Sequence, residues 1–143
     1  MFKIKAKKIQ VVRLSFQDNE LTDHQGKYSL NPELGANVGK LDENHYFTQL
    51  SVRVKNEEDQ AFPIDVDVAV RAVFEVAAVE DEQALEGFLK KQGVHILFPY
   101  LRSTLSGLTS LAMVPPIVLP IIDASKLFDK INKSEKEDEE QQD

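Results

Sequence analysis

The first half of the chain alternates hydrophobic and polar residues, as strands with one buried face do. Residues 62–78 place hydrophobic side chains at the even positions, whereas Asp65 and Asp67 occupy odd positions. Residues 44–55 alternate in the same way, and a short polar turn separates the two segments. The pattern therefore predicts an antiparallel hairpin formed by 44–55 and 62–78.

The N-terminal segment alternates too, but its phase slips. Phe2, Ile4 and Ala6 share one parity, Ile9 and Val11 fall on the other, and the first parity then returns. A β-bulge explains the slip. So does a second apolar contact on the outer face, which would indicate a partner subunit. A short strand is expected near 36–42, after a long polar loop over 18–35.

The hydrophobic period changes after residue 80. Residues 80–91 begin with acids and end with lysines, and Gly93 follows, which are helix start and stop signals. Residues 94–112 repeat leucine at helical spacing, with Pro99 near the front of this segment, where a proline is tolerated. Asp123 is a plausible N-cap for a last short helix.

The order of these elements predicts the fold class. Strands come first and helices afterwards, which is typical of an α+β domain. We expect a four-stranded antiparallel sheet with a long helix and a short C-terminal helix packed on one face.

Between the helical segments lies "MVPPIVLPII", residues 113–122, which has no polar side chain and contains three prolines. The run is too apolar for an ordinary surface loop and too rich in proline for a helix. One interpretation is a buried crossover packed on the sheet. The other is an extended connector that displays apolar side chains to a ligand, because prolines remove N–H donors and resist helix formation.

Length and composition narrow the protein class. With 143 residues, the chain fits one domain with one core. It has no cysteine, which excludes disulfides and thiolate metal sites and fits a reducing compartment. No segment reaches the ~18–20 apolar residues of a membrane span. The basic N-terminus alternates, unlike a signal peptide. We therefore expect a cytoplasmic protein with no direct membrane insertion.

The negative charge is concentrated at the C-terminus. The net charge is −7, of which the last ten residues, "SEKEDEEQQD", contribute −5. Such a segment has no apolar residue to bury, so we expect a disordered acidic tail over 133–143 after one domain over 1–132. The overall acidity argues against nonspecific nucleic-acid binding, so we expect no nucleic acid as a partner. A local basic strip is the alternative, because the first 13 residues carry five basic groups and no acid.

No set of residues points to catalysis. His24, His45 and His95 are far apart in sequence and lack metal-ligand spacing. Asp65 and Asp67 share one strand face, but a solvated sheet surface explains them better than an acid–base pair does. We therefore expect a binding protein that is not an enzyme and needs neither metal nor cofactor.

The second half of the chain carries a specific combination of motifs. "ILFPYLR" (Ile96–Arg102) is followed by a helix rich in Leu, Thr and Ser, then by the prolyl run with "PP-x-x-L-P", and then by Leu127 and Phe128. With this spacing, residues 95–128 resemble the protein-export chaperone family SecB. The strand region agrees with that family in order and length.

The resemblance implies a function and an assembly. SecB proteins are homotetramers, arranged as dimers of dimers, that hold unfolded preproteins without ATP and deliver them to the translocase motor SecA. Their client grooves are lined by the loop after the first strand, the proline run and the last helix. Carried over position by position, the groove residues here are Tyr28, Leu30, Leu34, Val114, Ile117, Leu119, Ile121, Leu127 and Phe128. The long helix would supply core and tetramer contacts through Leu101, Leu105 and Leu108.

The resemblance also implies acidic contacts with SecA. The candidates are Asp65 and Asp67 on the sheet and, in the tail, Glu135, Glu137, Asp138, Glu139 and Glu140. Two acidic positions of the family's first strand are Arg13 and Gln17 here, and its paired glycines on the last strand are Arg71 and Ala72.

These departures keep two alternatives open. One is a SecB-like chaperone of a toxin–antitoxin system that protects a labile antitoxin. The other is a specific adaptor or ligand-binding protein on the same scaffold.

Overall fold

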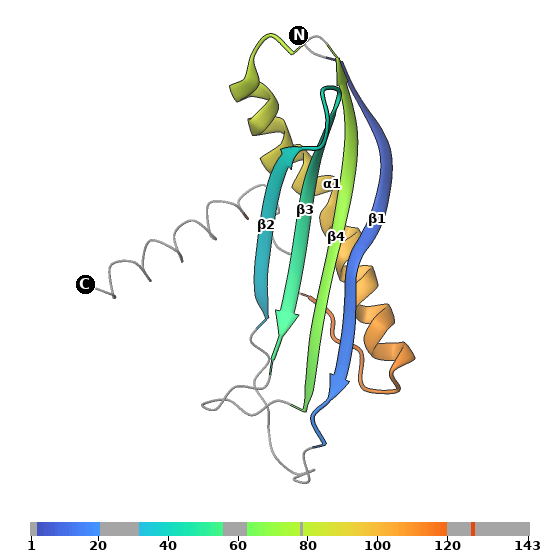
Figure 1. Ribbon diagram of the computed structural model, residues 1–143. Coiled ribbons are helices and arrows are strands. Elements are labelled where there is room, and N and C mark those ends of the chain that lie inside the picture. Colours follow the sequence, from blue (N-terminus) through green and yellow to red (C-terminus); the bar gives the residue numbers. More distant parts are fainter. Residues whose placement is uncertain (1–2, 21–31, 56–62, 78, 120–126, 128–143) are drawn as a thin grey trace, which may run out of the picture.

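The computed structural model describes residues 3–20, 32–55, 63–77, 79–119 and 127. These residues form four strands and one long helix, in the order β1 (Lys3–Asp18), β2 (Glu33–Lys40), β3 (His45–Val54), β4 (Ile64–Ala77) and α1 (Glu82–Leu111). The strands make one sheet in the order β1-β4-β3-β2, and α1 crosses one of its faces (Figure 1). The predicted α+β fold is confirmed. The expected short C-terminal helix lies outside the described residues apart from Leu127.

The central hairpin is the one that the alternation predicts. β3 and β4 pair antiparallel, with Leu50 opposite Val70 and Val52 opposite Val68 on the face toward α1. On the other side of β3, β2 pairs antiparallel and begins and ends a few residues earlier than the expected 36–42. Because every described strand is antiparallel to its neighbours, one sheet face is left to solvent.

The phase slip of the N-terminal strand is a pair of β-bulges. β1 pairs with β4, and its register shifts between Ala6 and Lys8 and again between Val11 and Arg13. Each extra residue reverses the alternation, so Ile9 and Val11 return to the face of Ala6 instead of the lysine face. The bulge interpretation is thus confirmed for the register.

The helix is continuous, so the predicted stop at Gly93 is wrong. α1 begins at the N-cap Asp81, whose side chain accepts hydrogen bonds from the backbone N–H of Gln83 and Ala84, and it runs through Gly93 and Pro99. Gly93 is buried where α1 crosses the sheet and has a packing role. Pro99 lies in the interior of the helix, not near its front, and faces solvent. An interior proline costs roughly 3 kcal/mol, a cost that packing of the helix's buried face offsets.

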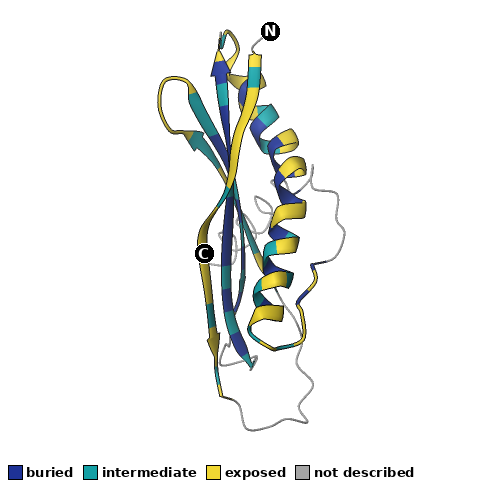
Figure 2. Cartoon of the chain, turned by 90° about the vertical axis from the view of Figure 1, so that its right-hand side faces the viewer, coloured by how far each residue is buried: buried dark blue, intermediate teal, exposed yellow. Residues whose placement is uncertain are grey.

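The core lies between α1 and the sheet. Most of its buried side chains come from β3, β4 and α1, and Phe74 and Phe88 meet edge to face with ring centroids 5.6 Å apart. Figure 2 shows the buried stripe of α1 facing the sheet and β1 exposed along most of its length. This arrangement leaves three surfaces for function: the helix side of β1, the segment after α1, and the outer face of the sheet.

Candidate functional site

The prolyl run turns back along the helix that precedes it. At the C-terminus of α1, Met113 N–H donates to the Ser110 carbonyl oxygen at 3.1 Å, and Val114 N–H donates to that of Thr109 at 3.2 Å. This is a Schellman motif, in which the residue after the C-cap is left-handed and is usually glycine. Here that residue is Met113, with φ of 63°. The chain therefore reverses direction at a strained, non-glycine position.

Two side chains of α1 then hold the run in place. The buried Thr109 hydroxyl accepts the Ile117 N–H at 3.0 Å and also lies 3.0 Å from the Leu105 carbonyl oxygen, to which it donates. Further along, Arg102 Nε donates to the Leu119 carbonyl oxygen at 2.9 Å. Because each bond joins the run to a different turn of α1, residues 114–119 form an extended segment lying along the helix (Figure 1).

Several side chains expected in the client groove are part of the core. Ile117 is 8% exposed, Leu119 1% and Leu127 2%, and all three belong to the hydrophobic core cluster. Their burial in the chain agrees with the buried-crossover interpretation of the run, and their assignment to a client groove stays a prediction. The physical reason is that the run is anchored parallel to the sheet surface, so alternate side chains point inward.

The remaining groove candidates divide into two groups. Leu34 on β2 and Val114 are half-buried and pack against the core cluster. Tyr28, Leu30, Ile121 and Phe128 lie outside the described residues. On α1, Leu101 and Leu105 are fully buried and Leu108 is half-buried, which places all three toward the core.

The exposed apolar residues near the run are ones that sequence reasoning did not single out. Leu111 is 82% exposed, Met113 94% and Val118 59%. We call these three residues the turn cluster. Leu111 and Met113 are exposed at the turn where the chain reverses. Val118 is exposed further along the run, between the buried Ile117 and Leu119. The sequence offered one signal for the exposure of Val118: in an extended run, it points to the side opposite Ile117 and Leu119.

A second apolar surface runs along β1. Ile9, Val11 and Leu14 lie on the helix side of the sheet and are 37%, 50% and 52% exposed. α1 packs on β3, β4 and β2, which leaves this flank of the sheet uncovered (Figure 2). A row of exposed β-branched and leucine side chains on an edge strand is typical of a protein–protein contact.

A groove opens at the opposite edge, between β2 and the first turns of α1. Its volume is about 320 Å³, and its apolar lining comes from Val38, Tyr46, Leu85 and Leu89. Lys40, Glu82 and Glu86 lie on its rim. No pattern in the sequence predicts this groove, because its walls come from segments that only the folded chain brings together.

The two acidic residues of the sheet that are candidates for the SecA contact, Asp65 and Asp67, both have partners within the chain. Asp67 lies between Arg13 and Arg53, with its oxygens 2.9 Å and 3.0 Å from the two guanidinium groups. Partial burial raises the pKa of Asp67, but the two arginines more than offset this effect and hold the pKa below its usual value. Asp65 accepts a hydrogen bond from Asn19. The acidic candidates of the tail, Glu135 to Glu140, lie outside the described residues.

The described part of the chain offers neither a candidate metal site nor a candidate membrane span. Within it, no group of three or more His, Asp or Glu side chains is placed to hold a metal ion. No helix there is long and apolar enough to cross a membrane. The candidate site consists of the exposed apolar surfaces described above, on a single-sheet α+β scaffold.

The comparisons with known proteins agree with this class of protein. The model of the family "Preprotein translocase subunit SecB" matches residues 2–135. The protein-export protein SecB of Buchnera aphidicola is 32% identical over 144 residues, covering 94% of this chain and 92% of that protein. The SecB of Saccharophagus degradans is 33% identical over 107 residues, covering 73% of this chain and 62% of that protein.

The fold has a solved relative. The SecB-like chaperone of Mycobacterium tuberculosis, in complex with a ChAD peptide from the HigA1 antitoxin, superposes with a TM-score of 0.67 at 20% identity, covering 83% of this chain and 90% of that one. At this identity the likeness shows the fold. The chain belongs to the SecB family, as the family match and the Buchnera relative show.

Proposed function

We propose that this protein is a holdase chaperone that binds unfolded polypeptides on exposed apolar surfaces without ATP. The observation that carries the proposal is the turn cluster. Met113 holds a left-handed backbone that glycine would adopt more easily, yet its side chain is 94% exposed. Backbone strain of this kind persists where function requires the side chain. The groove beside Val38 and Leu89 offers a second apolar contact for the same client.

The assembly belongs to the same proposal. A homotetramer, built as a dimer of dimers, would cover the exposed side chains of Ile9, Val11 and Leu14. Those residues are too apolar and too numerous to remain in water along one edge strand. Light scattering then gives about four times the 16.2 kDa chain mass. Replacing Val11 and Leu14 by Ser should lower that mass.

Client binding is tested by aggregation of a chemically unfolded protein diluted into buffer without nucleotide. The native chain should suppress light scattering at stoichiometric tetramer. Replacing Leu111, Met113 and Val118 by Ser should reduce suppression while the oligomer mass stays unchanged. If the triple variant suppresses aggregation as well as the native chain does, the turn cluster is not the binding surface.

The proposal includes a role in protein export, in which the chaperone hands unfolded preproteins to SecA. Family membership supports it, and the acidic tail supplies the candidate contacts, because Asp67 is already compensated by two arginines. Replacing the acids at 135, 137, 138, 139 and 140 by their amides should weaken capture of SecA. If this variant captures SecA as well as the native chain does, the acidic tail is not part of the SecA contact.

An antitoxin is the second candidate client. The solved relative from Mycobacterium tuberculosis carries an antitoxin peptide, and the sheet of the present chain has lost acids at Arg13 and Gln17. This branch predicts one tight, specific client and weak suppression of aggregation of unrelated unfolded proteins. The aggregation assay with two or three unrelated clients therefore separates the branches.

A further inference from the structure

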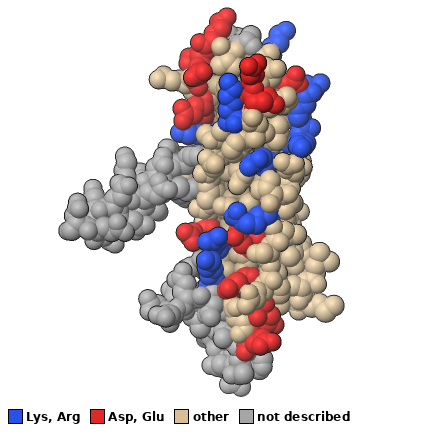
Figure 3. Space-filling view, in the orientation of Figure 1, with Lys and Arg blue, Asp and Glu red and all other residues tan. Residues whose placement is uncertain are grey.

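The outer face of the sheet is basic although the chain as a whole is acidic. Its strands carry seven Lys or Arg side chains and four acidic ones, while the net charge of the protein is −7. The basic residues are Lys3, Lys5, Lys7, Lys8, Arg13, Arg53 and Arg71, and the acidic ones are Glu33, Asp65, Asp67 and Glu75. Figure 3 shows basic side chains along the β1 side of this face and across its middle.

The bulges of β1 make this strip continuous. Without the shift after Ala6, Lys8 would point toward α1. With it, Lys8 lies opposite Val73 on the outer face, in line with Lys5 opposite Glu75. Gln10 then lies opposite Arg71, and the second shift turns Arg13 to the same face. From Lys3 to Arg13 the strip is about 30 Å long at the ~3.3 Å rise of a strand.

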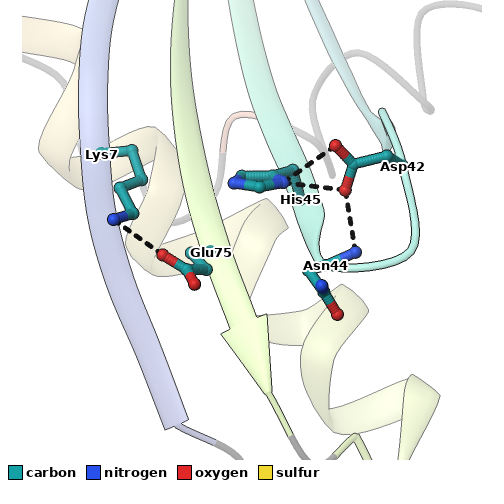
Figure 4. A network of polar contacts seen from close by, with 5 residues as sticks. All are labelled: Lys7, Asp42, Asn44, His45 and Glu75. Carbon is teal, nitrogen blue, oxygen red and sulfur yellow. Dashed lines mark hydrogen bonds and ion pairs between the residues drawn. The ribbon is translucent and has the colours of Figure 1, made fainter.

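Internal ion pairs neutralise only part of this charge. Lys7 binds Glu75 at 2.8 Å, and this contact holds the pKa of Glu75 below its usual value (Figure 4). Asp67 compensates one of its two arginines. Arg71 donates from both Nε and Nη2 to the neutral amide oxygen of Gln49 and lies over the Phe47 ring, so its charge is fixed in place without an acidic partner.

We propose that this basic strip, defined as Lys3, Lys5, Lys8 and Arg71, binds an extended acidic segment of a partner protein. The strip is extended, and its lysines lie opposite alternate residues of β4, which matches the two-residue repeat of an extended peptide. Gln49 and the Phe47 ring already hold the Arg71 guanidinium in place. The Arg71 side chain therefore loses less conformational entropy when it binds a carboxylate. The acids Glu75 and Asp67 interrupt the strip and disfavour the continuous phosphate backbone of a nucleic acid. This surface lies on the face opposite α1 and is independent of the turn cluster.

The test measures binding of labelled acidic peptides to the full chain by fluorescence anisotropy. One 12-residue peptide alternates Glu and Ser, and a second has the same composition in two blocks. The alternating peptide should bind more tightly than the block peptide by about threefold or more, because its carboxylates lie on one side when extended. Binding should weaken roughly fivefold or more between 20 and 200 mM salt.

Matched variants locate the site. Replacing Lys5 and Lys8 by Gln should weaken binding of the alternating peptide by about fivefold, since two positive charges of the strip are removed. Replacing Lys40 and Lys91 by Gln removes the same charge away from the outer face and should change binding by less than about twofold. All four lysines are exposed, so both variants should fold, which circular dichroism verifies. Suppression of client aggregation should be unchanged in the variant with Lys5 and Lys8 replaced, because neither residue belongs to the turn cluster or to the groove beside Val38. This readout separates failure of this proposal from failure of the chaperone proposal.

Four results would overturn the proposal. They are equal loss in the two double variants, equal affinity for the two peptides, absence of binding at 20 mM salt, and tighter, lysine-dependent binding of a 12-residue oligothymidine. A full chain whose five tail acids are replaced by amides provides a last control. If that change alone raises peptide affinity tenfold, the occupant is the protein's own tail and not a partner.

Discussion

Gly93 of α1 lies directly against Thr48 of β3 at the point where the helix crosses the sheet. A Cβ added at Gly93 would lie 3.0 Å from Thr48 Cβ and 3.3 Å from its Cγ2. The fully buried Thr48 hydroxyl donates to the Leu89 carbonyl oxygen at 2.7 Å, one turn earlier in the helix. The hydrogen bond and the close contact together fix the distance between α1 and the sheet. At this distance, Cβ and Cγ2 of Thr48 leave no room for a side chain at residue 93.

Gly93→Ala should destabilise the protein although alanine favours helix more than glycine does. Helix propensity alone would stabilise by about 1 kcal/mol, but displacing a packed helix costs about 1–3 kcal/mol. We expect a net loss in the free energy of unfolding, measured by urea titration. Gly87→Ala and Gly107→Ala are the matched controls, because nothing lies within 4 Å of a Cβ at either position. Both should stabilise, and a stabilising Gly93→Ala would contradict the packing role.

Much of the fold follows from local patterns in the sequence. Period-two alternation located β1, β3 and β4, because an antiparallel sheet with one solvated face imposes it. The error at Gly93 arose because glycine serves both to end helices and to admit close packing, and only the tertiary contact with Thr48 distinguishes the two. The bulges of β1 were visible as a phase slip, but their consequence for Ile9 and Val11 required the register.

The candidate site was less predictable than the fold. The prolyl run was found from composition, but composition did not show that Ile117 and Leu119 are buried in the folded chain. Two hydrogen bonds decide which side of the run faces inward: the Ile117 N–H donates to the Thr109 hydroxyl, and Arg102 donates to the Leu119 carbonyl oxygen. Neither bond can be read from the local sequence pattern. Arg13 was recognised as a departure from the family, but its pairing with Asp67 across two strands depends on the second bulge.

Asp67 should make stability depend on pH at the acidic end. Its pKa is lowered in the folded state, so its contribution is fully present above the pKa of the unfolded chain, near ~3.9, and is lost as the pH falls through the lower folded value. Asp67→Asn should therefore cost about 1 kcal/mol at pH 7 and progressively less below about pH 4.

The measurement is urea unfolding of the native and Asp67→Asn proteins between pH 7 and pH 3. Asp42→Asn is a useful comparison, because Asp42 has a lowered pKa through the Asn44 N–H and His45 but its side chain is 62% exposed. A difference between native and Asp67→Asn proteins that stays constant down to pH 3 would show that the carboxylate charge is not what Arg13 and Arg53 stabilise.

Neighbouring residues of the prolyl run should respond oppositely to truncation. Ile117 is 8% exposed and Val118 59%, so the two side chains lie on opposite sides of the same strand-like segment. Ile117→Ala should lower the free energy of unfolding by roughly 2–4 kcal/mol, as core truncations do. Val118→Ala should change it by less than about 0.5 kcal/mol and should instead reduce suppression of client aggregation. Equal destabilisation by both would mean that Val118 is covered in the assembled protein.

Met113 should show a trade between stability and binding. Its φ of 63° costs little for glycine but about 1 kcal/mol for methionine, so Met113→Gly should raise the free energy of unfolding by about that amount. Met113→Asn should have a smaller stabilising effect, because asparagine tolerates the left-handed region. Both remove an apolar side chain that is 94% exposed, so both should weaken suppression of client aggregation.

The neighbouring C-cap supplies the control for this trade. Ala112 has φ of −78°, where glycine gains nothing, so Ala112→Gly should lower stability by roughly 0.5–1 kcal/mol and leave aggregation suppression unchanged. Thermal unfolding and the aggregation assay on the same four proteins give both quantities. If Met113→Gly stabilises the chain and still protects the client fully, the methionine is retained for another reason and the client contacts must be sought at Leu111, at Val118 or in the groove beside Val38.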